Sequence, residues 1–172
     1  IELRLLAHIS GDENMRAAFA SGADIHTATA AQVFHVAPEE VTPEMRRSAK
    51  AVNFGIVYGI SAFSLSQDIG VSVAEAKAYM EAYFATFPGV RTYMDAIVER
   101  AREQGYVETL FHRRRDLPEL KSSNFNLRSF GERVALNMPI QGTAADIMKL
   151  AMVAVRKRLR QELPEARLVL QV

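Results

Sequence analysis

One stretch of the sequence carries cations and aromatic rings at a regular spacing. From residue 46 to residue 58 they recur every four residues, as Arg46, Lys50, Phe54 and Tyr58. In an α-helix four residues turn the chain by about 400°, so such a row drifts by only about 40° per step and keeps to one face. The cations lie toward the N-terminal end, where the helix dipole is also positive. This face suits a nucleotide, with cations on the triphosphate and rings that stack at roughly 1–3 kcal/mol per base.

Two glycines, Gly55 and Gly59, lie in the same stretch. Each costs about 1 kcal/mol relative to Ala in a helix interior, which indicates that bulk is unwelcome there. Periodicity alone equally describes an amphipathic helix whose rings belong to the core, and that is the more common case. The chain has no Walker loop and no GxGxxG motif, so a triphosphate site here has to be built from side chains.

A second polar row, Arg133, Asn137 and Gln141, has the same spacing of four residues. Arg and Gln donors can bind the acceptors that every base pair presents in the minor groove, which tests base-pair shape without reading sequence. Alternatively, the Asn137 side chain caps a helix break at Pro139 by hydrogen bonding to the backbone groups left unpaired there. The basic run 113–115 either contacts nucleic-acid phosphates or is a solvated turn.

Charge is unevenly distributed along the 172 residues, although the net charge is only +1. Residues 1–45 carry a balance of −5, and residues 61–99 carry −3. The segments 46–60, 100–133 and 134–172 each carry +3. This asymmetry favours a polyanionic partner, although imbalances of this size also describe ordinary solvated helix faces.

Composition excludes several kinds of site. The absence of cysteine excludes disulfides, zinc–thiolate sites, iron–sulfur clusters and cysteine nucleophiles. None of the four histidines belongs to an HExxH motif. No apolar run approaches the ~20 residues of a membrane span, and no signal peptide opens the chain. The sequence begins at Ile1 and ends at Val172 within apolar segments, which predicts an internal piece of a longer protein.

Capping and turn signals predict a mainly α fold with a few short strands. The predicted helices cover 11–19, 25–34, 43–58, 73–86, 90–104 and 126–161. The first follows a capping box at Ser10, the second follows Asp24, the third Thr42-Pro43, and the fourth a capping box at Ser72. Pro139, Gly142 and Pro164 are expected to interrupt or end the last helix. Residues 106–111 predict the first half of a hairpin, with residues 113–115 as its turn and residues 117–118 as its return. Residues 166–172 predict a final strand.

Several motifs in order resemble the family A DNA polymerases, most closely their bacterial members. The segment 46–59 is similar to the nucleotide-binding helix of that family, and residues 1–8 to the end of its first palm motif. Residues 24–30 resemble its fingers segment, and residues 133–146 its primer–template helix. Residues 168–172 resemble the strand that leads into its second catalytic carboxylate. The resemblance spans the whole chain.

The resemblance implies a role for each matching position. The implied dNTP contacts are Arg46, Lys50 and His26 on the phosphates, Phe54 on the sugar, Tyr58 near the templating base and Glu2 against a ribose 2′-hydroxyl. The implied DNA contacts are Arg113, Arg114, Arg128, Arg133, Asn137 and Gln141. His112 stands where relatives often carry Gly, so the turn there is expected to differ. Asp146 is expected to serve packing or capping.

The resemblance also implies a fold and a reaction. Residues 1–20 match a palm remnant, 21–122 the fingers with the nucleotide-binding helix 43–58, and 123–172 the primer–template helix and a palm strand of a right-hand polymerase. The family's reaction is template-directed transfer of a nucleotide to a primer end, with Mg²⁺ bound by Asp ligands expected just outside both ends of this chain. We therefore expect no catalytic or metal-binding residue here, and no polymerisation by the isolated chain.

The implied partners are primer–template DNA and dNTP, with no membrane, for a monomeric bacterial protein of the cytoplasm and nucleoid. Two other classes stay open. One is a non-catalytic nucleic-acid-binding relative, and the other is a structural helical protein in which Lys50 is freely replaceable.

Overall fold

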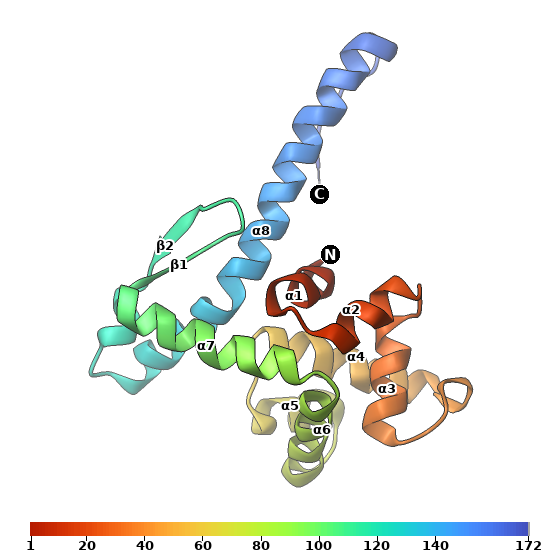
Figure 1. Ribbon diagram of the computed structural model, residues 1–172, viewed down its shortest axis with the longest axis vertical. Helices are drawn as coiled ribbons and strands as arrows, with labels where there is room; N and C mark the ends of the chain where they lie inside the picture. Colours follow the sequence, from red (N-terminus) through yellow and green to blue (C-terminus); the bar gives the residue numbers. More distant parts are fainter. Residues whose placement is uncertain (172) are drawn as a thin grey trace.

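The computed structural model describes residues 1–171 and has a largely helical fold (Figure 1). The elements in chain order are α1 (Glu2–Ser10), α2 (Glu13–Ala20), α3 (Ile25–Phe34), η1 (Pro38–Glu40), α4 (Pro43–Val57), α5 (Ala62–Ile69), α6 (Val73–Thr86), α7 (Pro88–Gln104), β1 (Tyr106–Glu108), β2 (Arg114–Asp116), η2 (Pro118–Lys121) and α8 (Phe125–Glu162). The mainly α fold with a short hairpin confirms the sequence prediction of fold class. No helix within residues 1–171 has the length and apolar character needed to cross a membrane.

The larger apolar core lies between α1, α4, α6 and α7. Its fully buried side chains include Leu6, Met15, Ile56, Leu65, Tyr83, Val90 and Ile140. Helix α3 packs along α4, and α1 contacts both α7 and α8. Burial of this core stabilises the positions of α1, α3 and α4 relative to each other. Side chains from three distant parts of the sequence can therefore meet at one site.

A smaller core joins the hairpin to the long helix. Its buried members are Ala101, Val107, Leu117, Leu120 and Ala135. Strands β1 and β2 pair antiparallel, with Val107 opposite Arg115. The first strand ends three residues earlier than the sequence predicts, since residues 109–112 form the turn. The predicted turn at residues 113–115 is wrong, because Arg114 and Arg115 pair with the first strand. In the turn, His112 has a left-handed backbone with φ of 60°. Glycine adopts this conformation without strain, and His does not.

Helix α8 continues without a break through Pro139 and Gly142, so the expected interruptions at these two residues are wrong. Pro139 and Ile140 are buried, and the Thr143 hydroxyl donates a hydrogen bond to the Pro139 carbonyl. Packing offsets the local cost of the proline, because tertiary contacts contribute most of the stability of a helix in a protein. The end after Glu162, just before Pro164, agrees with the prediction.

Three other local predictions need correction. Asp12, not Ser10, caps α2, so the helix begins at Glu13, two residues later than predicted. The Asp12 carboxylate accepts hydrogen bonds from the backbone N–H of Met15 at 2.8 Å and of Gly89 at 2.7 Å. A buried carboxylate that can bridge two helix starts is a stronger cap than the Ser10 hydroxyl, and Ser10 instead ends α1. Helix α5 was not expected, although Ser61 caps its start and Gly70 follows its end. Helix α7 begins at Pro88, two residues earlier than predicted.

The predicted final strand is absent from residues 166–171, and Val172 lies outside the described residues. After α8 the chain turns back beside this helix, and Val169 and Leu170 are exposed (Figure 1). A strand needs a neighbouring strand to pair its N–H and C=O groups, and no strand lies beside this segment in the part of the chain described. An apolar β-favouring run alone does not produce a strand.

Candidate nucleotide and nucleic-acid interface

Helix α4 begins and ends with local signals that the sequence contains. The Thr42 hydroxyl accepts the N–H of Met45 at 3.2 Å, and Pro43 occupies the first helical position. At the other end, the N–H of Ile60 donates to the Gly55 carbonyl at 2.8 Å, and Gly59 has φ of 67°. This pattern is a Schellman motif. Gly59 therefore lies beyond the helix, which corrects the expectation that it is an interior glycine.

Bulk is excluded at both glycines, as the sequence predicts. A Cβ on Gly55 would lie 2.7 Å from the side chain of Ile60. A Cβ on Gly59 would lie 3.1 Å from Leu136 and 3.3 Å from Arg133, both on α8. The C-terminal end of α4 therefore docks closely on α8 at the position of Arg133.

The row of four side chains divides by exposure, with three members on α4 and the fourth, Tyr58, at the cap that follows its last residue. Arg46 and Lys50 are exposed, whereas Phe54 and Tyr58 are half-buried. The rings of Phe54 and Tyr58 are nearly parallel, with an interplanar angle of 17° and centroids 6.4 Å apart. The structure thus keeps the cations in solvent and places the rings over a partly enclosed surface.

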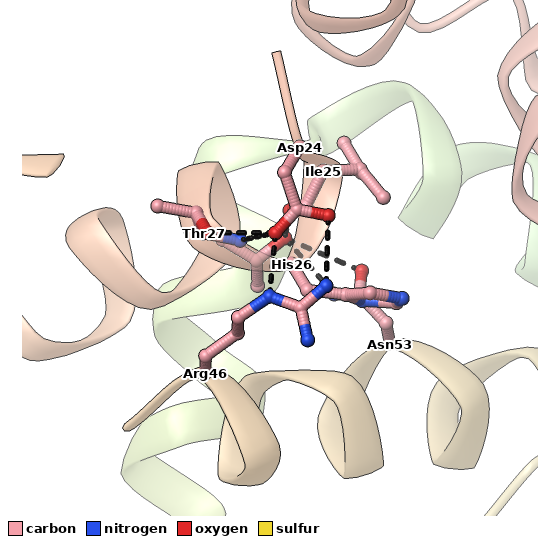
Figure 2. A network of polar contacts seen from close by, with 7 residues as sticks. Asp24, Ile25, His26, Thr27, Arg46 and Asn53 are labelled. Carbon is pink, nitrogen blue, oxygen red and sulfur yellow. Dashed lines mark hydrogen bonds and ion pairs between the residues drawn. The ribbon is translucent and has the colours of Figure 1, made fainter. Parts of the chain in front are cut away.

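Arg46 already has an anionic partner within the chain (Figure 2). Its Nε donates to Oδ2 of Asp24 at 2.7 Å, and its Nη2 donates to Oδ1 at 3.1 Å. Figure 2 shows the remaining guanidinium nitrogen pointing away from Asp24. The Arg46 guanidinium holds the pKa of Asp24 well below its usual range, and hydrogen bonds from Thr27 act in the same direction. The pair leaves one edge of the guanidinium available for a phosphate oxygen.

Asp24 has a second role as the cap of α3. Its Oδ2 accepts the backbone N–H of Thr27 at 3.0 Å and the Thr27 hydroxyl at 2.6 Å. The sequence predicts this cap, but not the ion pair with Arg46. In the sequence, the feature that points to the Asp24–Arg46 ion pair is the Asp24 carboxylate at the start of the helix that carries His26. The separation of 22 residues between Asp24 and Arg46 concealed it.

His26 lies beside the same cations, between α3 and α4. The amide nitrogen of Asn53 is 3.2 Å from its Nδ1, and its ring centroid is 5.8 Å from that of Phe54. Burial lowers the pKa of His26; the Asp24 carboxylate opposes this shift, and the nearby Arg46 and Lys50 cations add to it. The sequence prediction did not include Asn53, whose only signal is an amide on the otherwise apolar side of α4.

Glu2 and Tyr58 join α1 to the end of α4. The Tyr58 hydroxyl donates to Oε2 of Glu2 at 2.9 Å across 56 residues of sequence. Burial and the Glu2 carboxylate raise the pKa of Tyr58, and the Gln141 side chain opposes them. A cavity of about 290 Å³ contains Glu2, His26 and Phe54 in its lining. The structure therefore brings together the residues expected to contact the sugar and the phosphates.

The row on α8 faces the end of α4. Arg133 helps line a cavity of about 500 Å³ with Phe54 and Tyr58. The side-chain oxygen of Asn137 is buried and has no hydrogen-bond partner among residues 1–171. Gln141 is exposed and lies close enough to Tyr58 to affect its pKa. The polar rows of α4 and α8 thus meet at Tyr58.

The other predicted DNA contacts have partners within the chain. Arg113 pairs with Asp146 on α8 at 2.9 Å and donates to the Gly142 carbonyl at 2.9 Å. Asp146 is therefore an ion-pair partner as well as a packing residue. The close approach needs Gly142, because a Cβ there would lie 2.6 Å from Thr109. These contacts tie the hairpin to the helix that carries the polar row.

Arg114 stabilises the hairpin, and Arg128 stabilises the segment before α8. Arg114 pairs with Asp116 at 2.7 Å and covers the ring of Tyr106 at 3.7 Å. Arg128 donates to the Ser122 carbonyl at 2.8 Å in the segment before α8. Both side chains keep further N–H donors, so these contacts are compatible with a phosphate on the same guanidinium.

Within residues 1–171 no three His, Asp or Glu side chains lie close enough together to hold a metal ion. A divalent cation prefers several hard oxygen ligands.

Comparison with known proteins gives one consistent result. The sequence model described as "DNA polymerase family A" matches residues 1–172. The chain is 59% identical to DNA polymerase I of Geobacillus stearothermophilus and 58% identical to DNA polymerase I of Bacillus subtilis, each over 172 residues. The alignment covers 100% of this chain but 20% of each relative, so the chain spans about one fifth of their length.

A solved structure gives the same relationship in three dimensions. It is described as the POL domain of Pol1 from M. smegmatis in complex with DNA primer-template and dNTP. The TM-score is 0.89 at 48% sequence identity, and the superposition covers 94% of this chain and 28% of that one.

Proposed function

Because this chain belongs to DNA polymerase family A, we propose that it is the part of a template-directed DNA polymerase that binds the incoming dNTP and the primer–template. In that reaction the primer 3′-oxygen attacks the α-phosphorus of the dNTP, and pyrophosphate leaves. The observation that carries the proposal is the meeting of Arg46, His26 and Lys50 with the rings of Phe54 and Tyr58 at one solvent-open site. Phosphate, sugar and base each have a chemically suitable surface there.

The two ends of α4 have different roles in this proposal. Arg46 offers its free guanidinium edge to the phosphates, and Lys50 adds a second positive charge. Phe54 packs against the sugar and Tyr58 lies near the templating base. The hydrogen bond from Tyr58 holds the Glu2 carboxylate, which stands against a ribose 2′-hydroxyl and so favours a deoxynucleotide.

The α8 row is proposed to contact the minor groove of the primer–template. Arg133 and Gln141 are exposed donors beside the end of α4. Their position next to Tyr58 supports a role at the base pair nearest the incoming nucleotide. Arg113, Arg114 and Arg128 are proposed to hold phosphates with the donors that their intrachain contacts leave free.

The subdomain division belongs to the same proposal: palm for residues 1–20, fingers for 21–122, and primer–template helix and palm for 123–172. The family in general requires a divalent metal ion. The described residues offer no ligand cluster for it, so we derive no step through the metal. We propose Mg²⁺ as the ion, held by residues outside this chain, and a monomer that acts on the bacterial nucleoid in the cytoplasm.

Titration of the chain with a fluorescent dNTP tests the phosphate site. Arg46→Ala and Lys50→Ala are each expected to weaken binding about tenfold, because a hydrogen bond to a charged group contributes about 1.5–3 kcal/mol. The matched control is Arg47→Ala, which removes the same charge from the neighbouring exposed residue and is expected to change the dissociation constant less than twofold. Equal weakening by all three substitutions would contradict the assigned residues.

A segment exchange tests the reaction. This chain replaces the matching 172 residues of B. subtilis DNA polymerase I, which share 58% identity. Primer extension is expected from the exchange protein and is expected to fall with Lys50→Ala. The chain alone is expected to give no extension product. An inactive but DNA-binding exchange protein would favour the non-catalytic alternative.

A further inference from the structure

A short chain of buried hydrogen bonds lies directly behind the phosphate-facing residues. It runs from the Ile25 carbonyl through Thr29 and Asn53 to the His26 ring, and we call it the α3–α4 relay. Thr29 is 1% exposed and Asn53 is 0% exposed. Burying polar side chains this deeply costs free energy unless they form hydrogen bonds. The hydrogen-bond distances therefore indicate which atom of each pair donates a proton and which accepts it.

The Thr29 hydroxyl sets the direction of the relay. It donates to the Ile25 carbonyl at 2.8 Å, and it approaches Oδ1 of Asn53 only at 3.3 Å. A hydroxyl has one proton, and the shorter contact to a carbonyl takes it. The hydroxyl lone pairs are then left to accept a hydrogen bond from Nδ2 of Asn53 at 3.0 Å.

Asn53 passes this direction to the histidine. Its amide nitrogen has two protons: one points at Thr29, and the other faces Nδ1 of His26 at 3.2 Å. Nδ1 therefore accepts, and the single proton of the neutral ring lies on Nε2. Figure 2 shows His26 and Asn53 next to the Asp24–Arg46 pair, where the phosphates are proposed to bind.

We propose that Asn53 and Thr29 are positioning residues that hold His26 as the Nε2–H tautomer, so that it presents one N–H donor to a phosphate oxygen of the incoming nucleotide. This inference rests on the proposed function for its phosphate partner, but not for the tautomer. Since Asn53 lies on α4 and His26 on α3, the relay also ties the donor on one helix to the cations on the other.

The charged groups around the ring come from three elements. Asp24 stands at the start of α3, and Arg46 and Lys50 project from α4. Glu2 and Arg4 of α1 line the same cavity as His26. On the side of α3 and α4, the ring therefore has one carboxylate and two cations near it. On the side of α1, it has one carboxylate and one cation. The hydrogen bond found at a ring nitrogen of His26 comes from the Asn53 amide, so we assign the choice of tautomer to the relay.

Asn53→Asp reverses the polarity of the relay without changing its shape. A carboxylate can only accept, so His26 has to carry a proton on Nδ1. In the full chain labelled with ¹⁵N, the ring nitrogens of His26, assigned with the His26→Gln variant, are expected to report Nε2–H alone in the parent. In Asn53→Asp they are expected to report a protonated Nδ1. Unchanged ring signals in a folded Asn53→Asp chain would overturn the tautomer assignment.

Thr29 supplies the second pair of variants in case Asn53→Asp does not fold. Thr29→Val keeps the side-chain shape but removes the acceptor for the amide of Asn53, and is expected to give a mixture of His26 tautomers. Thr29→Ser keeps the hydroxyl and is expected to restore the parent signals. A single Nε2–H tautomer in Thr29→Val would overturn the role of Thr29 and with it the relay.

Nucleotide titration on the same samples separates this inference from the proposed function. The Asn53→Asp chain is expected to bind dNTP about tenfold more weakly than the parent at pH 9, where neutral His26 turns an Nε2 lone pair toward the phosphate. The ratio of the two dissociation constants is expected to shrink as pH falls and Nε2 regains its proton. A constant ratio with Arg46-dependent binding would overturn the phosphate role of His26. No dNTP binding by the parent would reject the proposed function while the ring signals still decide the tautomer.

Discussion

The proposed phosphate end of α4, with Arg46, Lys50 and the neighbouring His26, and the polar row on α8, with Arg133, Asn137 and Gln141, hold their side chains in different ways. At the phosphate end, Asp24 pairs with Arg46 and Asn53 binds His26. On α8, the Asn137 oxygen is buried without a partner in the part of the chain described, and Arg133 and Gln141 point to solvent. Both regions present cations and amides. Among residues 1–171, the first region has a cation and a ring held by Asp24 and Asn53, whereas in the second the Asn137 oxygen has no partner and Gln141 reaches Tyr58.

This difference indicates how each region would meet its ligand. Groups that are already oriented lose little freedom on binding, which suits selection of a small mobile nucleotide. Exposed donors such as Arg133 keep N–H groups for the ligand, which suits a large polyanion that supplies many contacts at once. The two asparagines, Asn53 and Asn137, give the sharpest form of the comparison.

The largest effect is expected from Asn53→Leu. The change removes the amide that satisfies the Thr29 hydroxyl and the His26 ring in a fully buried site. We expect the free energy of unfolding to fall by about 2–3 kcal/mol, measured by urea denaturation with circular dichroism. A change below 0.5 kcal/mol would show that the relay does not stabilise the contact between α3 and α4.

Asp24→Asn is expected to strengthen nucleotide binding. Asn caps a helix as well as Asp does, so α3 is retained, but the charge that competes with the phosphates for Arg46 is lost. We expect the dissociation constant for dNTP to fall about fivefold at low salt, and this gain to shrink as salt screens the charges. Weaker binding would instead mean that Asp24 is needed to orient Arg46.

The same variant tests the acid stability of the pair. The pKa of Asp24 is lowered in the folded chain, so the pair stabilises the fold above the unfolded pKa of about 3.9 and this contribution is lost as pH falls through the folded value. Below about pH 4, we expect the free energy of unfolding to depend less steeply on pH in Asp24→Asn than in the parent. The pair is half exposed, so its effect near neutral pH is expected to be small.

Asn137→Leu is expected to have the opposite sign from Asn53→Leu. It replaces a buried oxygen that has no partner in the described chain with an apolar side chain of similar size. We expect the free chain to be unchanged or more stable by up to about 1 kcal/mol, and its affinity for primer–template DNA to fall. A loss of stability equal to that of Asn53→Leu would remove the proposed difference between the two regions.

The smallest effect is expected from His112→Gly in the hairpin turn. His112 has φ of 60°, and Gly relieves the strain of the left-handed backbone at some cost in unfolded-state entropy. We expect the free energy of unfolding, measured by thermal or urea denaturation, to rise by about 0.5–1 kcal/mol. His35→Gly is the matched control, since His35 ends α3 with φ of 55° at a distance from the hairpin. No gain in either variant would mean that neither turn stores strain.

Local signals predicted the helices with short-range causes. The caps at Asp24, Thr42 and Ser72 are confirmed, because each acts on a backbone N–H three residues away. Predictions that ignored distant packing were wrong. Helix α8 passes Pro139 because Pro139 and Ile140 are buried, and Asp12 replaced Ser10 as a cap because it also binds Gly89, 77 residues away.

The sequence by itself determined the face of α4, because a spacing of four residues and the geometry of the helix are enough to align Arg46, Lys50, Phe54 and Tyr58. Only the tertiary structure decided what meets that face. Asp24, His26 and Glu2 reach it across 22, 27 and 56 residues from their partners. Contacts at such separations depend on how α1, α3 and α4 pack in the shared core, which periodicity along one helix does not record.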